Sequence, residues 1–485
     1  MTSTSASSND THSDKRRPIG YKPIALDGGY GWWVVLGSFL IHVFADGFLY
    51  SFGVFGESLV KRYNASNKSV SMILSVLSGL MYLIGPISAI ICNRVGCRAA
   101  TIVGAIVAVI GCAASFFATR LAHLVLTVGV VMGVGFGLMY CPALVIVTMY
   151  FEKKRSLATG ITVCGSGVGT LIFSKLIGFL LDKLPAEHLL TVFPIYAGLL
   201  LLCIPCGFLF RPFPCNQYMK WRKIARKIMN SKKNRKEILV SGERKNIRTS
   251  LLANPVYVLF VCASVLNTVG FNAVPMFIPM NAESEKGLRQ SKQTAATTVS
   301  AYGLANMIGR LLFGLLCDRQ LPFHWGKDCA RNRIWIFSIT LFISGLACCF
   351  VFSIASIWVY VIFCAFFGFM VSSYASLTSV VMVDLIGVDR LTNGLGLLFM
   401  FHGIACVLGP LVGGHLFDTT CNYSWTFIFF GSSLMAGGLV LPFARLIYKR
   451  RRMGMKDDQQ SLLDEDDESA ALMTATEEGQ SFHKV

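Results

Sequence analysis

The sequence predicts an all-α membrane protein with twelve transmembrane helices, and composition is the first observation that supports this fold class. Of the 485 residues, 54% are hydrophobic and only 14% are charged, and the mean hydropathy is +0.59. A soluble domain carries about 25% charged residues. This chain could not cover a soluble surface, so its excess apolar side chains must face lipid. The composition therefore excludes a soluble enzyme, a disordered scaffold and a secreted disulfide module.

A series of twelve apolar runs is the second observation. A spanning helix needs about 20 apolar residues, and each run reaches about that length. We expect helices because the runs lack the period-two alternation that is typical of barrel strands. The expected spans lie near residues 31–56, 70–91, 99–118, 122–150, 156–181, 188–210, 253–280, 294–317, 332–354, 356–385, 392–417 and 424–448.

Polar segments divide these runs into two groups of six. The first 26 residues are polar, and no cleavable signal peptide is visible because the first apolar run is too long and begins too late. A segment with thirteen Lys and Arg residues separates the sixth run from the seventh. The predicted organisation is an N-terminal tail (1–26), an N-terminal six-helix half (27–210), a basic linker (211–252), a C-terminal six-helix half (253–448) and a C-terminal tail (449–485).

The formal net charge of +18 predicts the orientation of the chain in the membrane. If both termini and the linker share one side, that side holds 33 of the 44 Lys and Arg residues and the opposite loops hold eight. Because Lys and Arg accumulate in cytoplasmic loops, we expect cytoplasmic termini and contact with anionic lipid rather than with nucleic acid. The outer loop 57–69 would then expose Asn64 and Asn67, which both begin an N-glycosylation pattern.

The cysteine pattern indicates no metal site and no cofactor. The sixteen cysteines are scattered, mostly within apolar runs, and no Cys-x-x-Cys pair has a matching His or Cys partner. Nothing in the sequence resembles an ATP site or the selectivity filter of a channel.

The two groups of six runs repeat a short pattern. Gly79-Leu80, Ile84-Gly85 and Asn93-Arg94 recur as Gly303-Leu304, Ile308-Gly309 and Asp318-Arg319. Two six-helix halves with an internal repeat and a long link resemble the major facilitator superfamily. The resemblance implies a major facilitator fold of two six-helix halves, with the substrate near the middle of the membrane between halves that rock.

Two further segments narrow the resemblance. Residues 27–32 (Asp-Gly-Gly-Tyr-Gly-Trp) open the first helix and residues 150–160 (Tyr-Phe-Glu-Lys-Lys-Arg-Ser-Leu-Ala-Thr-Gly) open the fifth. Together they resemble the signature motifs of the monocarboxylate transporter family, and residues 383–385 and 391–396 resemble its tenth-to-eleventh helix region. The likeness is greater to less-studied members than to the lactate carriers. The family implies plasma-membrane transport and an optional single-pass accessory glycoprotein. The alternative is that these motifs are fold and topology elements rather than substrate contacts.

A third resemblance concerns the loops after the second and eighth helices. Residues 93–98 and Asp318-Arg319 resemble the cytoplasmic loop motif of the superfamily, which latches the halves in one state. Asn93 stands where an Asp is usual, so we expect the first latch to be weaker than the second. The residues that we assign to gating or to the cytoplasmic motifs are Asp27, Arg94, Arg98, Lys153, Arg155, Asp318, Arg319 and Asp384.

Arg310 is the clearest ionisable residue within an apolar run. A charge inside the membrane is a functional hypothesis by default, and a guanidinium can bind a carboxylate through two parallel hydrogen bonds. The resemblance implies the same role, because the matching arginine of the lactate carriers binds the substrate carboxylate. The alternative is a structural ion pair with a carboxylate such as Asp46.

The other candidate substrate-binding residues are His42, Asp46, Tyr50, Asn306 and His402. Tyr50 and Asn306 stand where the lactate carriers have a lysine and an aspartate, so we expect a different substrate or transport that protons do not drive. His42 and Asp46 are four residues apart and share a helix face. They are either a pair that handles a cation or a proton, or buried structural groups. His402 stands where related members often have an arginine.

These observations predict a secondary active or facilitative transporter of small monocarboxylates or related carboxylate-bearing solutes, working by alternating access with a proton as an optional second cargo. Two alternatives stay open. One is a proton-independent facilitator of a zwitterion of the creatine, carnitine or amino acid type. The other is a nutrient sensor that binds its ligand without translocating it.

Overall fold

The computed structural model describes residues 27–65, 67–183, 186–211, 251–283, 288, 292–320, 328–420, 422–443 and 446. The predicted tails and nearly all of the predicted linker lie outside the described residues. Within the described residues, twelve helices are long and apolar enough to cross a membrane, and each overlaps one predicted run. The prediction of an all-α protein with twelve spans is therefore confirmed.

Several spans of the N-terminal half are interrupted. The second span breaks at Ile84, where Pro86 lies in the first turn of the following helix, because proline cannot continue the backbone hydrogen bonding of a preceding helix. A π-helix, Val125–Met132, interrupts the fourth span. The helices of this half are α1 (Gly31–Ser51), α2 (Gly56–Tyr63), α3 (Asn67–Leu83), α4 (Gly85–Arg94), α5 (Cys97–Ala114), α6 (Leu121–Leu124), α7 (Gly133–Tyr150), α8 (Arg155–Lys183), α9 (Val192–Leu200) and α10 (Cys203–Leu209).

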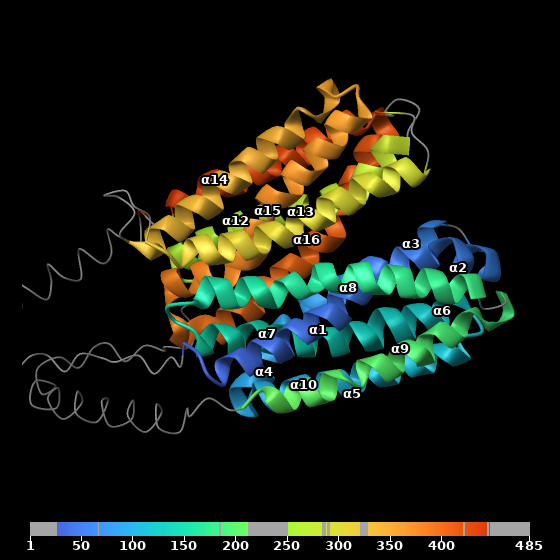
Figure 1. Cartoon of the computed structure of the whole chain (residues 1–485), viewed down its shortest axis with the longest axis horizontal. Coiled ribbons are helices and arrows are strands. Elements are labelled where there is room, and N and C mark those ends of the chain that lie inside the picture. Colours follow the sequence, from blue (N-terminus) through green and yellow to red (C-terminus); the bar gives the residue numbers. More distant parts are fainter. Residues whose placement is uncertain are drawn as a thin grey trace, which may run out of the picture.

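The spans of the C-terminal half are mostly unbroken. They are α12 (Pro255–Glu283), α13 (Lys292–Cys317), α14 (Cys329–Cys349), α15 (Ile357–Ile386), α16 (Leu391–Thr420) and a final span, Tyr423–Phe443. Figure 1 shows the blue-to-green helices of the first half in one bundle and the yellow-to-red helices of the second half in another, with α16 at the junction.

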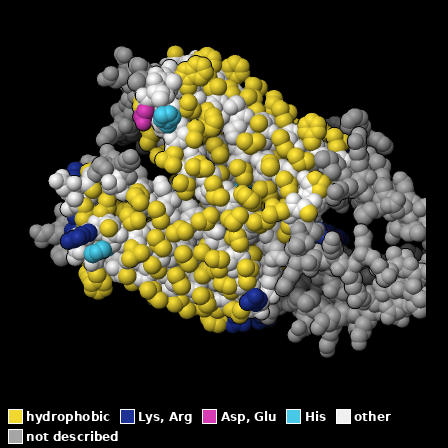
Figure 2. Space-filling model, turned by 180° about the vertical axis from the view of Figure 1, so that it is seen from behind, with side chains coloured by type: hydrophobic (Ala, Val, Ile, Leu, Met, Phe, Trp, Pro, Cys, Tyr) yellow, Lys and Arg dark blue, Asp and Glu magenta, His cyan; other side chains and the backbone are white. Residues whose placement is uncertain are grey.

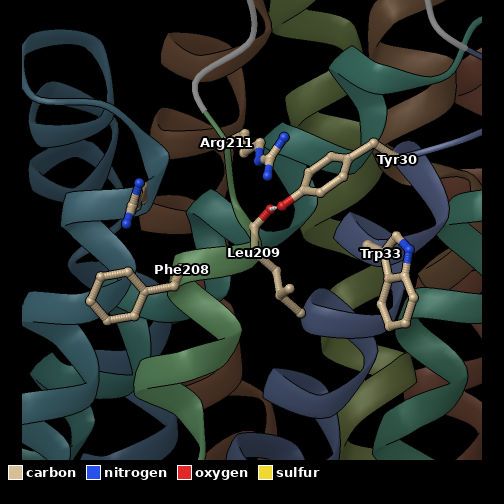
Figure 3. A pocket seen from close by; sticks show the side chains of 6 residues that line it. Tyr30, Trp33, Phe208, Leu209 and Arg211 are labelled. Carbon is tan, nitrogen blue, oxygen red and sulfur yellow. Dashed lines mark hydrogen bonds between the residues drawn. The ribbon is translucent and has the colours of Figure 1, made fainter.

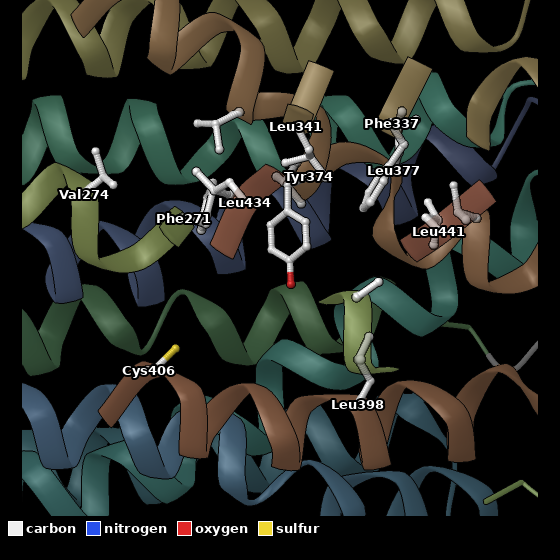
Figure 4. Packing of buried hydrophobic residues seen from close by; sticks show 14 of the residues in the cluster. Phe271, Val274, Phe337, Leu341, Tyr374, Leu377, Leu398, Cys406, Leu434 and Leu441 are labelled. Atoms are coloured by element: carbon white, nitrogen blue, oxygen red, sulfur yellow. The ribbon is translucent and has the colours of Figure 1, made fainter. Parts of the chain in front are cut away.

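Each half has its own apolar core. Phe48, Phe136 and Phe193 are fully buried in the first, and Tyr257, Phe337 and Phe367 are fully buried in the second. Figure 4 shows part of the second core, where the ring of Tyr374 lies among apolar side chains and its hydroxyl points toward α16. Close packing of these side chains holds the helices of each half together within the membrane.

The surface agrees with a position in lipid. Apolar side chains cover most of the face shown in Figure 2, and the charged side chains visible there lie toward its ends. Trp33, Ile110, Trp358 and Leu411 are each more than half exposed. In water such a surface would be a large aggregation patch, whereas in a bilayer it faces acyl chains.

Candidate functional site

The halves touch along two seams, and the first joins α8 to α13. Its glycines bring the two backbones into contact. A Cβ atom on Gly160 would lie 2.6 Å from the carbonyl oxygen of Arg310, and one on Gly314 would lie 2.9 Å from that of Ser156. Only glycine permits this approach, so the sequence pattern of these helices sets how closely the halves can meet.

The second seam joins α3 and α4 to α16 in the same way. A Cβ atom on Gly85 would lie 2.5 Å from the carbonyl oxygen of Gly396, and one on Gly403 would lie 2.8 Å from that of Gly79. The side chains of Asn93 and Asn393 continue this seam with a 2.6 Å hydrogen bond from Nδ2 to Oδ1.

Both seams are closed at one end of the molecule and part toward the other. We call the closed end the linker end, because α10 ends there and α12 begins there. Gly303 lies on the face of α13 that carries Met307, Arg310 and Gly314, yet a Cβ atom on Gly303 would meet nothing within 4 Å. On α8, Gly167 is the last described glycine that faces α13, where it lies against Met307. One turn farther along α8, the side chain of Leu171 is 47% exposed.

On α16, Gly414 likewise meets nothing within 4 Å, two helical turns beyond the contact of Val407 with Gly79. The two seams therefore end at a similar level. The structure represents a state that is closed at the linker end and open at the opposite end.

Arg310 lies where the first seam ends. Its side chain is buried, and Nη1 donates hydrogen bonds to the carbonyl oxygen of Val163 and to Oγ of Ser166, both on α8. Among the described residues, its Nε has no hydrogen-bond partner and Arg310 forms no ion pair. The alternative role suggested by the sequence, an ion pair with Asp46, does not occur in this state.

Three of the other candidates lie on one face of α1 near Arg310. The positive charge of Arg310 acts electrostatically on His42, Asp46 and Tyr50. His42 is fully buried, donates a hydrogen bond from Nδ1 to the carbonyl oxygen of Ser38 at 2.8 Å, and packs on the ring of Tyr140. Oδ1 of Asp46 is buried without a hydrogen-bond partner. Tyr50 is 46% exposed, as expected for a side chain on the open side of the seam.

The remaining two candidates are bound within the C-terminal half. Nδ2 of Asn306 donates to the carbonyl oxygen of Gly368 on α15, at 2.9 Å. Nε2 of His402 is hydrogen-bonded to the hydroxyl of Tyr374 at 3.1 Å, and that hydroxyl also pairs with Oγ1 of Thr268 at 2.6 Å. The structure thus brings Arg310 together with the α1 residues and attaches Asn306 and His402 to the inner framework of their own half.

The second predicted latch is a carboxylate at the start of a helix in the other half. Oδ1 of Asp318 accepts a hydrogen bond from the backbone N–H of Ser156 at 3.1 Å, and Oδ2 accepts one from that of Leu157 at 2.8 Å. These amides belong to the first turn of α8, where helix geometry leaves N–H groups without an internal acceptor. An anion is also favoured there by the helix dipole.

Arg333 supports this latch, and the sequence reasoning missed it. Its guanidinium bonds Asp318 at 3.0 Å and Asp384 at 3.1 Å, while Nε donates to the carbonyl oxygen of Cys317. Arg333 lies at the very start of the apolar run 332–354, where a cation does not stand out as a charge inside the membrane. Two acidic residues at the ends of the eighth and tenth spans were the available signal, since two carboxylates placed close together need a cation.

The two signature motifs bind each other inside the N-terminal half. Oδ1 of Asp27 accepts from the backbone N–H groups of Glu152 and Lys153, both at 2.8 Å. Asp27 itself has a positive φ of 38°. Nε of Arg155 donates to the carbonyl oxygen of Phe151 at 2.9 Å. These contacts fix the turn between α7 and α8, which fits the alternative that the motifs are fold elements.

The other predicted gating cations do not reach across the seams. Arg94, Lys153 and Arg319 are exposed. Arg98 is also exposed, and its guanidinium carbon lies 4.7 Å from the centroid of the Phe208 ring, within the N-terminal half. The latch at the α8–α13 seam is therefore the buried, charged cluster of Asp318, and the latch at the seam with α16 is the neutral amide pair of Asn93 and Asn393.

Comparison with known proteins identifies the architecture. The model of the Major Facilitator Superfamily matches residues 35–331 and 324–464. Human monocarboxylate transporter 12 is 27% identical over 436 residues, which cover 88% of this chain and 82% of that protein. Chicken monocarboxylate transporter 4 is 27% identical over 437 residues, which cover 90% of this chain and 86% of that protein.

Solved structures show the same fold. The proton:xylose symporter XylE aligns with a TM-score of 0.63 at 16% identity, covering 84% of this chain and 94% of that one. The transporter FucP in its outward conformation aligns with a TM-score of 0.57 at 14% identity, covering 85% of this chain and 98% of that one. The family match, the relatives and the twelve-helix fold together show that the chain belongs to the major facilitator superfamily and is a membrane transporter rather than an enzyme.

Proposed function

We propose that this transporter carries small carboxylate-bearing organic solutes by alternating access, and that Arg310 binds their carboxylate. The observation that carries the proposal is the buried guanidinium of Arg310, which has no ion-pair partner among the described residues and lies where the halves part. The names of the relatives, monocarboxylate transporters 12 and 4, support a substrate of this class.

The energetics of Arg310 favour a ligand. A buried charge without an opposite charge is costly, by several kcal/mol. Arg310 offsets only part of that cost with one carbonyl and one hydroxyl acceptor, and its Nε stays without a partner. A carboxylate entering from the open end could accept two parallel hydrogen bonds from this guanidinium. The charge of Arg310 is therefore better compensated when a carboxylate is bound than when the site is empty.

The same contacts suggest how binding is coupled to motion. Arg310 belongs to α13, whereas both of its acceptors, Val163 and Ser166, belong to α8 in the other half. A substrate that takes over the guanidinium weakens a bond between the halves. Binding then changes the relative stability of the two access states, which alternating access requires.

The test is uptake into cells or proteoliposomes by the variant Arg310→Lys. Lysine keeps the positive charge but cannot form the two parallel hydrogen bonds, so we expect uptake to fall by about a hundredfold, in line with the loss of about 3 kcal/mol. Arg390→Lys is the matched control, because Arg390 is exposed. Unchanged uptake by Arg310→Lys at equal surface expression would remove Arg310 from the site. Ligand binding without flux would support the sensor instead.

A zwitterionic substrate is the second candidate, and Asp46 is the observation that favours it. Its Oδ1 is buried and unpaired on the α1 face that Arg310 influences. A zwitterion offers a carboxylate to one of these groups and a cation to the other. Asp46→Asn should then abolish uptake of a zwitterion while sparing that of a simple monocarboxylate. Uptake that does not change between acidic and neutral pH would also exclude proton symport.

We place the linker, the linker end and both termini in the cytoplasm, at the plasma membrane. The distribution of Lys and Arg supports this orientation, and it makes the present state outward-open. Labelling of Arg62→Cys and Val95→Cys in intact cells with an impermeant thiol reagent tests it. Arg62 and Val95 are both exposed, in α2 and just after α4 respectively. Labelling of the first position only is expected, and labelling of the second position only would reverse the orientation.

A further inference from the structure

A separate pocket lies at the linker end of the N-terminal half. It is a surface pocket of about 540 Å³, largely open on one side, between the start of α1, the start of α5 and the end of α10 (Figure 3). All of its lining residues belong to the N-terminal half, so it is distinct from the seams and from Arg310. They are Tyr30, Trp33, Arg98, Phe208, Leu209 and Arg211.

The two arginines of the pocket are held by aromatic rings. The guanidinium carbon of Arg211 lies 4.4 Å from the centroid of the Tyr30 ring, and that of Arg98 lies 4.7 Å from the centroid of the Phe208 ring. The hydroxyl of Tyr30 donates to the carbonyl oxygen of Leu209 at 2.9 Å, which ties α1 to α10. A cation over an aromatic face keeps its charge and its N–H donors available.

The charge of the pocket has no counterpart among the residues that the structure describes. Both arginines are exposed, neither forms an ion pair with a described residue, and the described lining residues include no acidic side chain. The carboxylate of Asp27, which is close in sequence, is already bound to the backbone N–H groups of residues 152–154. Among the described residues, nothing neutralises the two positive charges that the pocket presents.

The position of the pocket indicates where its ligand comes from. The spans of α1 and α5 begin, and that of α10 ends, at Gly31, Cys97 and Leu209, so the pocket lies at headgroup depth. Trp33 is 56% exposed and Phe208 is 51% exposed beside it. Tryptophan and tyrosine concentrate at this boundary between lipid and water. A lipid headgroup can reach the arginines while its acyl chains lie along the apolar surface.

We propose that this pocket binds a phosphate group, and that the headgroup of an anionic phospholipid supplies it. Guanidinium groups form parallel hydrogen bonds with phosphate oxygens, and a cavity of this volume falls in the range of small-molecule sites. In the orientation proposed above, the pocket opens to the cytoplasmic leaflet, which is rich in anionic lipid. A bound lipid would bridge α5 and α10 and stabilise the N-terminal half.

Thermal unfolding of the full chain in neutral detergent tests the proposal. A short-chain phosphatidylglycerol should raise the unfolding temperature in a saturable way, and a phosphatidylcholine of equal chain length should not. Arg98→Gln and Arg211→Gln should each weaken the apparent affinity about tenfold or more, the value of a hydrogen bond to a charged group. Arg390→Gln is the matched control, since it removes an exposed charge at the same end, outside the pocket.

Fluorescence quenching locates the bound lipid. Phosphatidylglycerol with brominated chains should quench wild-type emission more than that of Trp33→Phe, and Arg98→Gln should abolish the difference. Both arginines are exposed, so their variants should fold, and unfolding without lipid checks this. Three results would each overturn the proposal. They are an equal rise in unfolding temperature with phosphatidylcholine, an equal loss of apparent lipid affinity in Arg390→Gln, and equal quenching of wild type and Trp33→Phe. Full protection by inorganic phosphate alone would overturn the lipid as its source.

Discussion

Replacing Asp318 with Asn should loosen the linker end of the transporter. In the wild type, the carboxylate of Asp318 receives the backbone N–H groups of Ser156 and Leu157 across the seam and also pairs with Arg333. Asparagine keeps the size of the side chain and removes the charge. Its amide N–H₂ group cannot accept a hydrogen bond, so one of the two α8 amides loses its acceptor.

The expected magnitude follows from these contacts. A hydrogen bond to a charged acceptor contributes about 1.5–3 kcal/mol, against about 1 kcal/mol for a neutral one. The favourable placement of an anion at a helix N-terminus adds about 0.3–1 kcal/mol. Arg333 keeps its second partner, Asp384, which limits the loss. We expect the closed linker end to be destabilised by about 2–3 kcal/mol, which is about a 30- to 150-fold change in the opening equilibrium.

Amide hydrogen exchange of residues 155–160 measures this effect directly. The N–H groups of Ser156 and Leu157 have no acceptor within their own helix, so their protection depends on Asp318. We expect exchange at these amides to accelerate by the same factor. Asp418→Asn, which removes an exposed acidic charge from α16, should leave it unchanged. Unaltered protection in Asp318→Asn would show that Asp318 does not hold the seam closed.

The remaining predictions concern other contacts. Gly160→Ala should place a Cβ atom 2.6 Å from the carbonyl oxygen of Arg310 and lower uptake by about tenfold through overpacking of the seam, whereas Gly198→Ala, which meets nothing within 4 Å, should transport normally. Asp27→Ala should lower the free energy of unfolding by about 2 kcal/mol, seen as a lower unfolding temperature, because several backbone N–H groups lose their acceptor; a shift of less than about one degree would contradict this role. Tyr374→Phe should lower the free energy of unfolding by about 1–2 kcal/mol and leave the substrate KM of uptake unchanged. A raised KM would place the hydroxyl of Tyr374 in the substrate site.

Much of the fold could be predicted because the bilayer imposes simple rules on sequence. Apolar runs of about 20 residues identify the spans, and all twelve appear in the structure. Interruptions within the helices were harder to predict. The run 31–56 was expected as one helix, yet α1 ends at Ser51 and a 3₁₀ turn, Phe52–Phe55, follows, because the geometry of helix ends depends on packing that apolar content does not reveal.

The site was predictable in part. Arg310 stood out because an arginine within an apolar run is rare, and the structure places it between the halves. The sequence did not indicate which way the side chains of Asn306 and His402 point. Their helices are apolar on most sides, so hydrophobic periodicity does not tell which face meets the other half. Contacts with Gly368 and Tyr374, which are distant in sequence, decide it.

The turn before α8 and the first turn of α8 each bind a carboxylate, and the two contacts predict different effects when they are lost. Asp27 binds residues 152–154 within one half, and Asp318 binds residues 156–157 from the other half. The first contact must survive every conformational cycle, whereas the second must break once in each. Loss of the first should therefore impair biogenesis and reduce the number of carriers in the membrane. Loss of the second should leave that number intact and change the turnover of each carrier.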